Sequence, residues 1–147
     1  MTTRVSSMWL KAASVVTILT GVICALASHS STGGLWLYLF DVLKWPIDGD
    51  PAVFNADTRA VNAVLGGVMV GWGVLMFSLS NERMMTAAPN VPRMMTISLL
   101  AWFMVDSIGS WAAGLPGNIA LNVAFLVMFL PPLVSLSRRF SGNIPAS

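Results

Sequence analysis

Charged residues are scarce in this sequence: Asp, Glu, Lys and Arg together make up only 10% of its 147 residues. Soluble domains average about 25% charged residues, and a small domain exposes much of its chain to solvent. The deficit therefore excludes a water-facing surface for most of the molecule. Hydrophobic residues make up 56% of the sequence, and the mean hydropathy is +0.76. These values predict an integral membrane protein whose main partner is the lipid bilayer.

Cysteine and histidine are nearly absent, with one residue of each. Cys24 alone cannot form an intrachain disulfide, and His29 alone completes neither a metal site nor a nucleophilic triad. The eight basic residues are scattered singly or in pairs, unlike the basic patch that phosphate binding needs. We therefore expect no metal, no cofactor and no nucleic-acid partner.

Much of the sequence consists of long apolar runs without Lys or Arg in their interiors. About 20 apolar residues cross the bilayer core as a helix, and backbone groups in lipid must bond within that helix. Such runs occur at 12–28, 60–79, 94–115 and 119–136. We predict an all-α integral membrane four-helix bundle that forms a single transmembrane domain over residues 1–147.

The first run also fits a cleaved signal peptide. Arg4 and Lys11 precede it, and "ALA" at 25–27 matches a signal-peptidase site. Cleavage there would leave three spans. Small residues at helical spacing favour a retained helix. We therefore expect the first span to be retained, with cleavage as the alternative.

Turn and capping residues predict where the helices end. Asn55 or Asp57 is expected to cap the second span, and Asn118 the fourth. The link "LPGN" at 115–118 is so short that the third and fourth helices must be antiparallel neighbours. Pro131 and Pro132 are expected to kink or end the fourth helix.

Basic residues divide unevenly between the two sides of the predicted spans. Lys and Arg near span ends mark the cytoplasmic side. In the loop 29–59, Lys44 and Arg59 are outnumbered by four Asp residues. This pattern predicts both termini in the cytoplasm and the loop 29–59 outside. The remaining basic residues lie on the predicted cytoplasmic side: Arg4, Lys11, Arg83, Arg93, Arg138 and Arg139.

The loop 29–59 contains the aromatic segment "LWLYLFDVLKW" at 35–45. Trp and Tyr favour the membrane interface, so we predict a short helix in the headgroup plane. It serves either as an anchor that sets depth or as a lid over an outward pocket. The acidic stretch at 48–57 lacks the spacing and closing Glu of a calcium loop.

Small residues recur every four positions on the first two spans. Gly21 belongs to such a row on the first, and Gly67 and Gly71 form a GxxxG pair on the second. Small residues let helix backbones approach in lipid. The rows predict that the first helix packs on the second. The alternative use is association in a homodimer or a larger membrane complex.

Asp106 is the only acidic residue within the four spans, inside "WFMVDSIGSWAAG" at 102–114. An ionised carboxyl group facing lipid is costly, so its side chain should face the bundle. It is either a polar node bonded to Asn122, Asn62 or serines, or the base of an outward-facing pocket. The candidate pocket residues all fall in the predicted outer half: Asp106, Arg59, Asn62, Asn122, Ser110, Asn118 and His29.

Two segments carry a resemblance: "FNADTRAVNAVLGGVMVGWGVLMFSL" at 54–79 and "AWFMVDSIGSWAAGLPGNIALNVAFLVMFLPPL" at 101–133. They resemble small four-helix inner-membrane proteins of bacteria, loosely the DoxX-like group, which also places an Arg before a glycine-rich second span. The resemblance covers roughly residues 35–133. It implies a four-helix bundle in the bacterial inner membrane and no particular activity.

The function expected from these patterns is non-enzymatic. The outward polar pocket would bind a small molecule, or the protein would act as an accessory subunit. One alternative is a membrane enzyme that acts on a lipid-like substrate with Asp106 as acid or base. Another is a proton-coupled transporter that works as a dimer. No complete catalytic set is present to decide for the enzyme.

Overall fold

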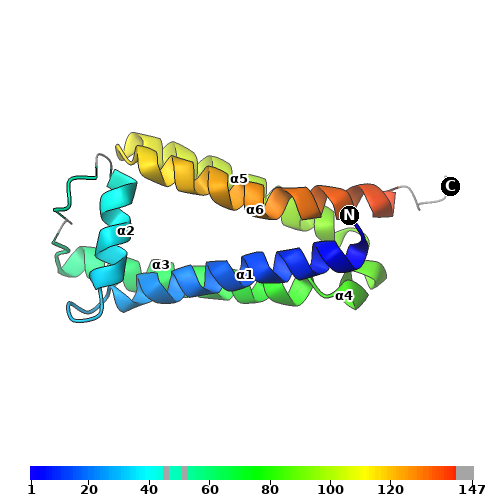
Figure 1. Cartoon of the computed structure of the whole chain (residues 1–147), viewed down its shortest axis with the longest axis horizontal. Coiled ribbons are helices and arrows are strands. Elements are labelled where there is room, and N and C mark those ends of the chain that lie inside the picture. Colours follow the sequence, from blue (N-terminus) through cyan, green and yellow to red (C-terminus); the bar gives the residue numbers. More distant parts are fainter. Residues whose placement is uncertain (45–46, 51–52, 142–147) are drawn as a thin grey trace.

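Four long helices make up most of the computed structural model, which describes residues 1–44, 47–50 and 53–141 (Figure 1). No strand occurs within these ranges. Each long helix is long and apolar enough to cross a membrane. The prediction of an all-α membrane four-helix bundle is thus confirmed. The four helices are α1 (Thr3–Leu26), α3 (Ala56–Leu79), α5 (Val91–Ala112) and α6 (Pro116–Ser141).

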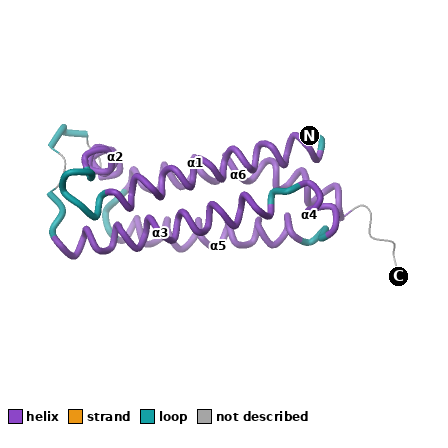
Figure 2. The backbone as a smooth tube through the Cα atoms, turned by 90° about the horizontal axis from the view of Figure 1, so that it is seen from below, coloured by secondary structure: helices purple, strands orange, loops and turns teal. Residues whose placement is uncertain are grey.

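Two short helices lie at opposite ends of the bundle. Helix α2 (Gly34–Lys44) lies across one end, at a steep angle to the long helices, and α4 (Glu82–Ala87) lies at the other (Figure 1). We call these the α2 end and the α4 end. The N-terminus and the last turn of α6 both lie at the α4 end (Figures 1 and 2). Helix α2 occupies the position of the short helix predicted at 35–45.

The long helices pack as two pairs, α1 with α3 and α5 with α6. Figure 2 shows that the pairs lie one behind the other, with α1 facing α6 and α3 facing α5. The short turn between α5 and α6 makes them antiparallel neighbours, as the sequence predicted. Helix α1 packs against α6 as well as α3. The first helix is therefore an integral part of the bundle.

Glycines allow the α1 and α3 backbones to approach closely. A Cβ atom on Gly21 would lie 2.9 Å from the Gly66 carbonyl oxygen, and one on Gly73 would lie 2.6 Å from Ile18 Cγ1. Gly21 therefore packs as expected, but Gly67 and Gly71 do not take part. A Cβ atom on either would meet nothing within 4 Å. The GxxxG pair faces outward because Gly66 and Gly73, seven residues apart, share the inner face of α3.

A continuous apolar core joins the two pairs toward the α4 end. Its buried side chains come from α1, α3, α4, α5 and α6. Nearer the α2 end the two pairs diverge, so that the bundle is wider there (Figure 1). The fully buried members of this core include Leu10, Leu99, Phe129, Leu133 and Leu136.

Helix α1 begins at Thr3, nine residues before the predicted apolar run, and two features of α6 also differ from those expected. Helix α6 begins at Pro116, because a proline ring presets the backbone for the first helical position and lacks only an N–H that would be unbonded there. Asn118 is therefore inside the helix and does not cap it. Pro131 and Pro132 do not end the helix, which runs to Ser141. Complete burial of Pro132 among core residues offsets the lost backbone bonds.

The cap of α3 is the one that the sequence predicted. The Asn55 side chain accepts a hydrogen bond of 2.8 Å from the Thr58 backbone N–H. This bond satisfies one of the free donors in the first turn. It fixes the start of α3 at Ala56, so that Asn62 lies two turns into the bundle.

Candidate functional site

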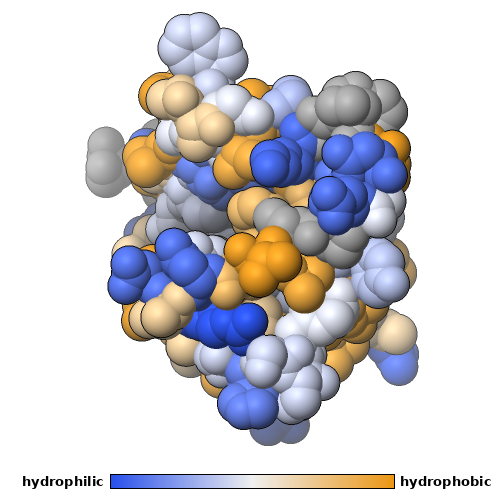
Figure 3. Space-filling view, turned by 90° about the vertical axis from the view of Figure 1, so that its left-hand side faces the viewer, coloured by the Kyte–Doolittle hydropathy of each residue, from blue (hydrophilic) through white to orange (hydrophobic). Residues whose placement is uncertain are grey.

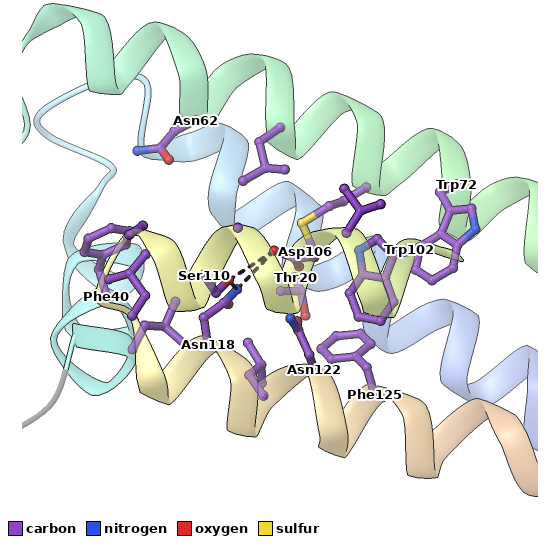
Figure 4. A pocket seen from close by; sticks show the side chains of 18 of the residues that line it. Thr20, Phe40, Asn62, Trp72, Trp102, Asp106, Ser110, Asn118, Asn122 and Phe125 are labelled. Carbon is purple, nitrogen blue, oxygen red and sulfur yellow. Dashed lines mark hydrogen bonds between the residues drawn. The ribbon is translucent and has the colours of Figure 1, made fainter. Parts of the chain in front are cut away.

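A cavity of about 800 Å³ lies between the two helix pairs, where they diverge toward the α2 end (Figure 4). Small-molecule sites in proteins occupy roughly 300–1,000 Å³. The cavity has a roof, a floor, a polar wall and a side opening, each built by a different part of the fold.

Helix α2 forms the roof. Trp36, Phe40 and Leu43 line the cavity from above. The Trp36 indole Nε1 donates a hydrogen bond of 3.3 Å to Asn62 Oδ1, which ties α2 to α3. On the other side, α2 rests on Gly117 of α6, where a Cβ atom would lie 2.7 Å from the Leu43 carbonyl oxygen. The roof is thus attached to both helix pairs.

The surface beyond the roof is mixed, with hydrophilic groups around a hydrophobic patch (Figure 3). Within it, the Gly49 N–H donates to Asp41 Oδ2 at 3.2 Å, and Gly49 has a positive φ of 74°. The Asp50 backbone N–H donates to Asp48 at 2.9 Å and lowers the pKa of that exposed carboxyl group. The Asp48 side chain at this end of the molecule is therefore ionised at neutral pH.

Aromatic rings form the floor of the cavity. The Trp102 ring lies 5.6 Å from the Trp72 ring and 6.2 Å from the Phe125 ring, measured between centroids. Trp72 in turn lies 5.8 Å from Phe129 of the core. These rings come from α3, α5 and α6 (Figure 4). The floor closes the cavity toward the α4 end.

Asp106 lies in the wall that α5 and α6 form. Its Oδ1 accepts hydrogen bonds from the Ser110 hydroxyl and from Asn118 Nδ2, both at 3.3 Å. Asn118 Nδ2 also donates to the Ser110 Oγ at 2.7 Å. The carboxyl group is half-buried and faces the cavity, six residues before the end of α5. That spacing corresponds to roughly 9 Å along the helix axis.

The sequence predicted that Asp106 faces the interior and bonds to another helix, but it predicted a different partner residue. Asn118 takes this role instead of Asn122 or Asn62. Asn122 is buried and donates from Nδ2 to the Ser107 hydroxyl at 3.2 Å. Because α6 begins at Pro116, Asn118 is already on a helical face opposite Asp106 and Ser110.

Asn62 is the polar residue that α3 contributes. Only 4% of its surface is exposed, and it lines the cavity from the side opposite Asp106 (Figure 4). Its oxygen accepts from Trp36, whereas its Nδ2 has no hydrogen-bond partner in the described structure. A buried N–H group without a partner is costly. Because Nδ2 is itself fully shielded, the polar surface that a molecule in the cavity would meet is the network of Asp106, Ser110 and Asn118 on the other side.

The cavity opens sideways between α3 and α5. Among the residues that line it, Leu65 of α3 is 45% exposed and Val105 of α5 is 73% exposed. Gly109 is also exposed, and a Cβ atom there would meet nothing within 4 Å. The lining residues of α1 and α6 are buried or half-buried. The opening thus lies on the face that the bilayer would cover.

Two of the predicted pocket residues lie outside this cavity. His29 is exposed in the turn after α1, where its Nδ1 lies 2.8 Å from the Ser31 hydroxyl. Arg59 donates from Nε to the Phe54 carbonyl oxygen at 3.1 Å and holds the segment before α3. Neither lines the cavity. The cavity does contain the other five: Asp106, Ser110, Asn118, Asn122 and Asn62.

Several residues of the site were missed in the sequence. Trp72 and Trp102 lie within long apolar runs, where nothing in the sequence distinguishes a cavity floor from ordinary core. Gly117 looked like part of a turn, although it is the seat of α2. Trp36 was placed in the interfacial helix, but its bond to Asn62 depends on how α2 folds over the end.

No family model, curated protein or solved structure matched this chain. The resemblance to DoxX-like proteins therefore stays a prediction from the sequence. Within the described ranges, no three His, Cys, Asp or Glu side chains come together to hold a metal ion. The fold and the site define a small α-helical membrane protein with a roofed, laterally open cavity.

Proposed function

We propose that this protein binds a small molecule in the cavity beneath α2. The observation that carries the proposal is a cavity of about 800 Å³ whose wall contains the hydrogen-bonded group of Asp106, Ser110 and Asn118. This group supplies both accepting and donating atoms in surroundings that are otherwise apolar.

Binding is favoured over acid–base catalysis by the composition of the lining. Asp106 is the only ionisable side chain among the described residues that line the cavity. General acid–base catalysis usually needs a second positioned group to orient or exchange the proton. Amides, hydroxyls and aromatic rings are suited instead to hold and orient a bound molecule.

We also propose that the α2 end faces the outside of a bacterial inner membrane. Support comes from the basic residues in the sequence, because Lys and Arg accumulate on the cytoplasmic side. The α4 end carries Arg83 in α4 and Arg93 in the first turn of α5. With this orientation the cavity lies in the outer half of the bilayer.

Native mass spectrometry tests the binding proposal. The full chain is extracted from its membrane with a polymer that retains the surrounding lipids, and is then released in the instrument. We expect one small molecule bound per chain. Thr20→Trp places an indole in the cavity and should remove the bound mass, since Thr20 lines the cavity. Leu19→Trp is the matched control, because Leu19 is 56% exposed on the neighbouring face.

Two results would overturn the binding proposal. A wild-type chain without any bound mass would contradict it. So would a bound mass that survives Thr20→Trp, because that molecule would be held elsewhere.

A further inference from the structure

We infer that the ligand is a neutral single-chain amphiphile with a hydroxyl-bearing head, and that it reaches the cavity from the bilayer between α3 and α5. This inference rests on the proposed function and goes further by naming the ligand class and its route.

The route follows from which sides of the cavity are closed. Helix α2 covers the α2 end and is attached to both pairs through Asn62 and Gly117. The aromatic floor closes the side toward the α4 end. Only the lining residues of α3 and α5 include exposed side chains between these limits, with Leu65 and Val105 on the two sides of the opening. A molecule that leaves the lipid sideways therefore meets the cavity without crossing water.

The apolar body of the ligand follows from most of the lining. Apart from the polar groups already described, the walls are aliphatic or aromatic side chains of α2, α3, α5 and α6. Met69 lies along α3 between Leu65 at the opening and Trp72 of the aromatic floor. An alkyl chain can thus remain in apolar surroundings throughout its passage, so little free energy of transfer opposes it.

The head group follows from the polar wall and from the apolar opening. Asp106, Ser110 and Asn118 supply accepting and donating atoms in the wall of the cavity. A hydroxyl group donates and accepts at the same time, so it matches this wall. A carboxylate or an ammonium head would have to carry a charge through the apolar opening, which is costly in lipid.

Photolabelling with three matched probes tests the head group. The probes are a monoacylglycerol, a fatty acid and an alkylamine of equal chain length, each with a diazirine at the chain end. The full chain is reconstituted in nanodiscs, and labelled residues are mapped by mass spectrometry of peptides. Label on Phe125, which is only 9% exposed, reports on the cavity and not on the surrounding lipid.

We expect the monoacylglycerol to label Phe125 most efficiently, about tenfold above the fatty acid at equal mole fraction. Asp106→Asn should keep the preference for the monoacylglycerol, because an amide still accepts and donates hydrogen bonds at this position. Equal labelling by all three probes, or a fatty acid or alkylamine that labels best, would overturn the assignment of the head group.

Glycine variants test the lateral route. Gly109→Leu places a bulky side chain at the opening and should slow the labelling of Phe125 by the monoacylglycerol. Gly67→Leu is the matched control, because added atoms at both glycines meet open space and Gly67 does not line the cavity. If both variants label at the wild-type rate, the route is wrong.

The two proposals fail in different ways. If Phe125 is labelled in the wild type but not in Thr20→Trp, the cavity binds small molecules whatever the order of the probes. The binding proposal then stands even where the head group or route is wrong. If Thr20→Trp leaves the label on Phe125 unchanged, both proposals are contradicted.

Discussion

A carboxyl group inside an apolar helix needs partners, and Asp106 obtains them from two sources. Ser110, one turn later on α5, supplies a local hydroxyl, and Asn118 supplies an amide from α6. The bond between Asn118 and Ser110 links these two donors to each other. The network therefore joins α5 to α6 next to their short turn, and it also turns a polar surface toward the cavity.

Substitution of Asp106 should separate its structural role from its charge. Asp106→Asn should keep the free energy of unfolding close to that of the wild type, because an amide oxygen can still accept from Asn118. Asp106→Leu should lower the free energy of unfolding by about 1–3 kcal/mol, since Asn118 and Ser110 lose their shared acceptor. Unfolding in mixed micelles, followed by circular dichroism, measures both values. Equal loss in the two variants would contradict the hydrogen-bonding account.

The sequence was sufficient to predict that Asp106 faces inward, because the cost of a charge in lipid does not depend on the fold. Its partner could not be predicted, since the pairing depends on where α6 begins. Asn118 is a good cap residue by type, and Pro116 at the first helical position moves it into the helix. Arg59 and His29 illustrate the same limit, because Arg59 bonds back from the first turn of α3 to the Phe54 carbonyl oxygen and His29 contacts Ser31 after α1.

At the scale of elements, close backbone contact decides which glycines matter. Helix α3 has glycines on two faces, and only Gly66 and Gly73 lie against α1. A pattern of small residues four apart predicts a close approach somewhere on a helix. Such a pattern does not identify the packed face of the helix when another glycine lies one position away, as Gly66 lies beside Gly67.

The neighbouring pair Gly66 and Gly67 gives a matched test of this packing. Gly66→Ala should destabilise the protein by about 1–3 kcal/mol, because a methyl group there collides with Gly21 and Ala25 of α1. Gly67→Ala should instead stabilise it by about 0.5–1 kcal/mol through its helix propensity. The same unfolding experiment measures both. A loss at Gly67 comparable to that at Gly66 would show that its face is also packed.

The seat of α2 on α6 gives a prediction for the roof. Gly117→Ala should push α2 away from α6, because the added methyl group would overlap with the backbone at Val42 and Leu43. Backbone amides of α2 should then exchange with deuterium faster, while those of α1 and α3 stay protected. Hydrogen exchange with mass spectrometry measures this difference. Unchanged protection of α2 would mean that its bond to Asn62 and its packing on α1 hold the roof without the seat on Gly117.

For the whole molecule, apolar length and charge are enough to define the bundle. Four spans and a short helix in the first long loop follow from runs and aromatic residues that can be read directly. The cavity could not be predicted, because it arises from the angle between two helix pairs and from Trp72 and Trp102 meeting across them. Such angles depend on side-chain packing at the far end, around residues such as Phe129.

The orientation in the membrane is testable with single cysteines. In a Cys24→Ser background, Ser30→Cys lies in the turn near α2 and Thr86→Cys lies in α4, and both positions are exposed. An impermeant maleimide added outside intact cells should label Ser30→Cys and not Thr86→Cys. After the cells are opened, both should react. Labelling of Thr86→Cys in intact cells would reverse the proposed orientation.

The divergence of the helix pairs toward the α2 end has a consequence for the surrounding lipids (Figure 1). The protein takes up more area in one leaflet than in the other, so it has the form of a wedge. Any closure of the cavity would reduce that area in one leaflet only. Lateral pressure within that leaflet therefore acts on the angle between the two helix pairs, which a bound molecule would hold open. Lipids of different shape should thus shift the affinity of the cavity for its ligand without contacting the cavity.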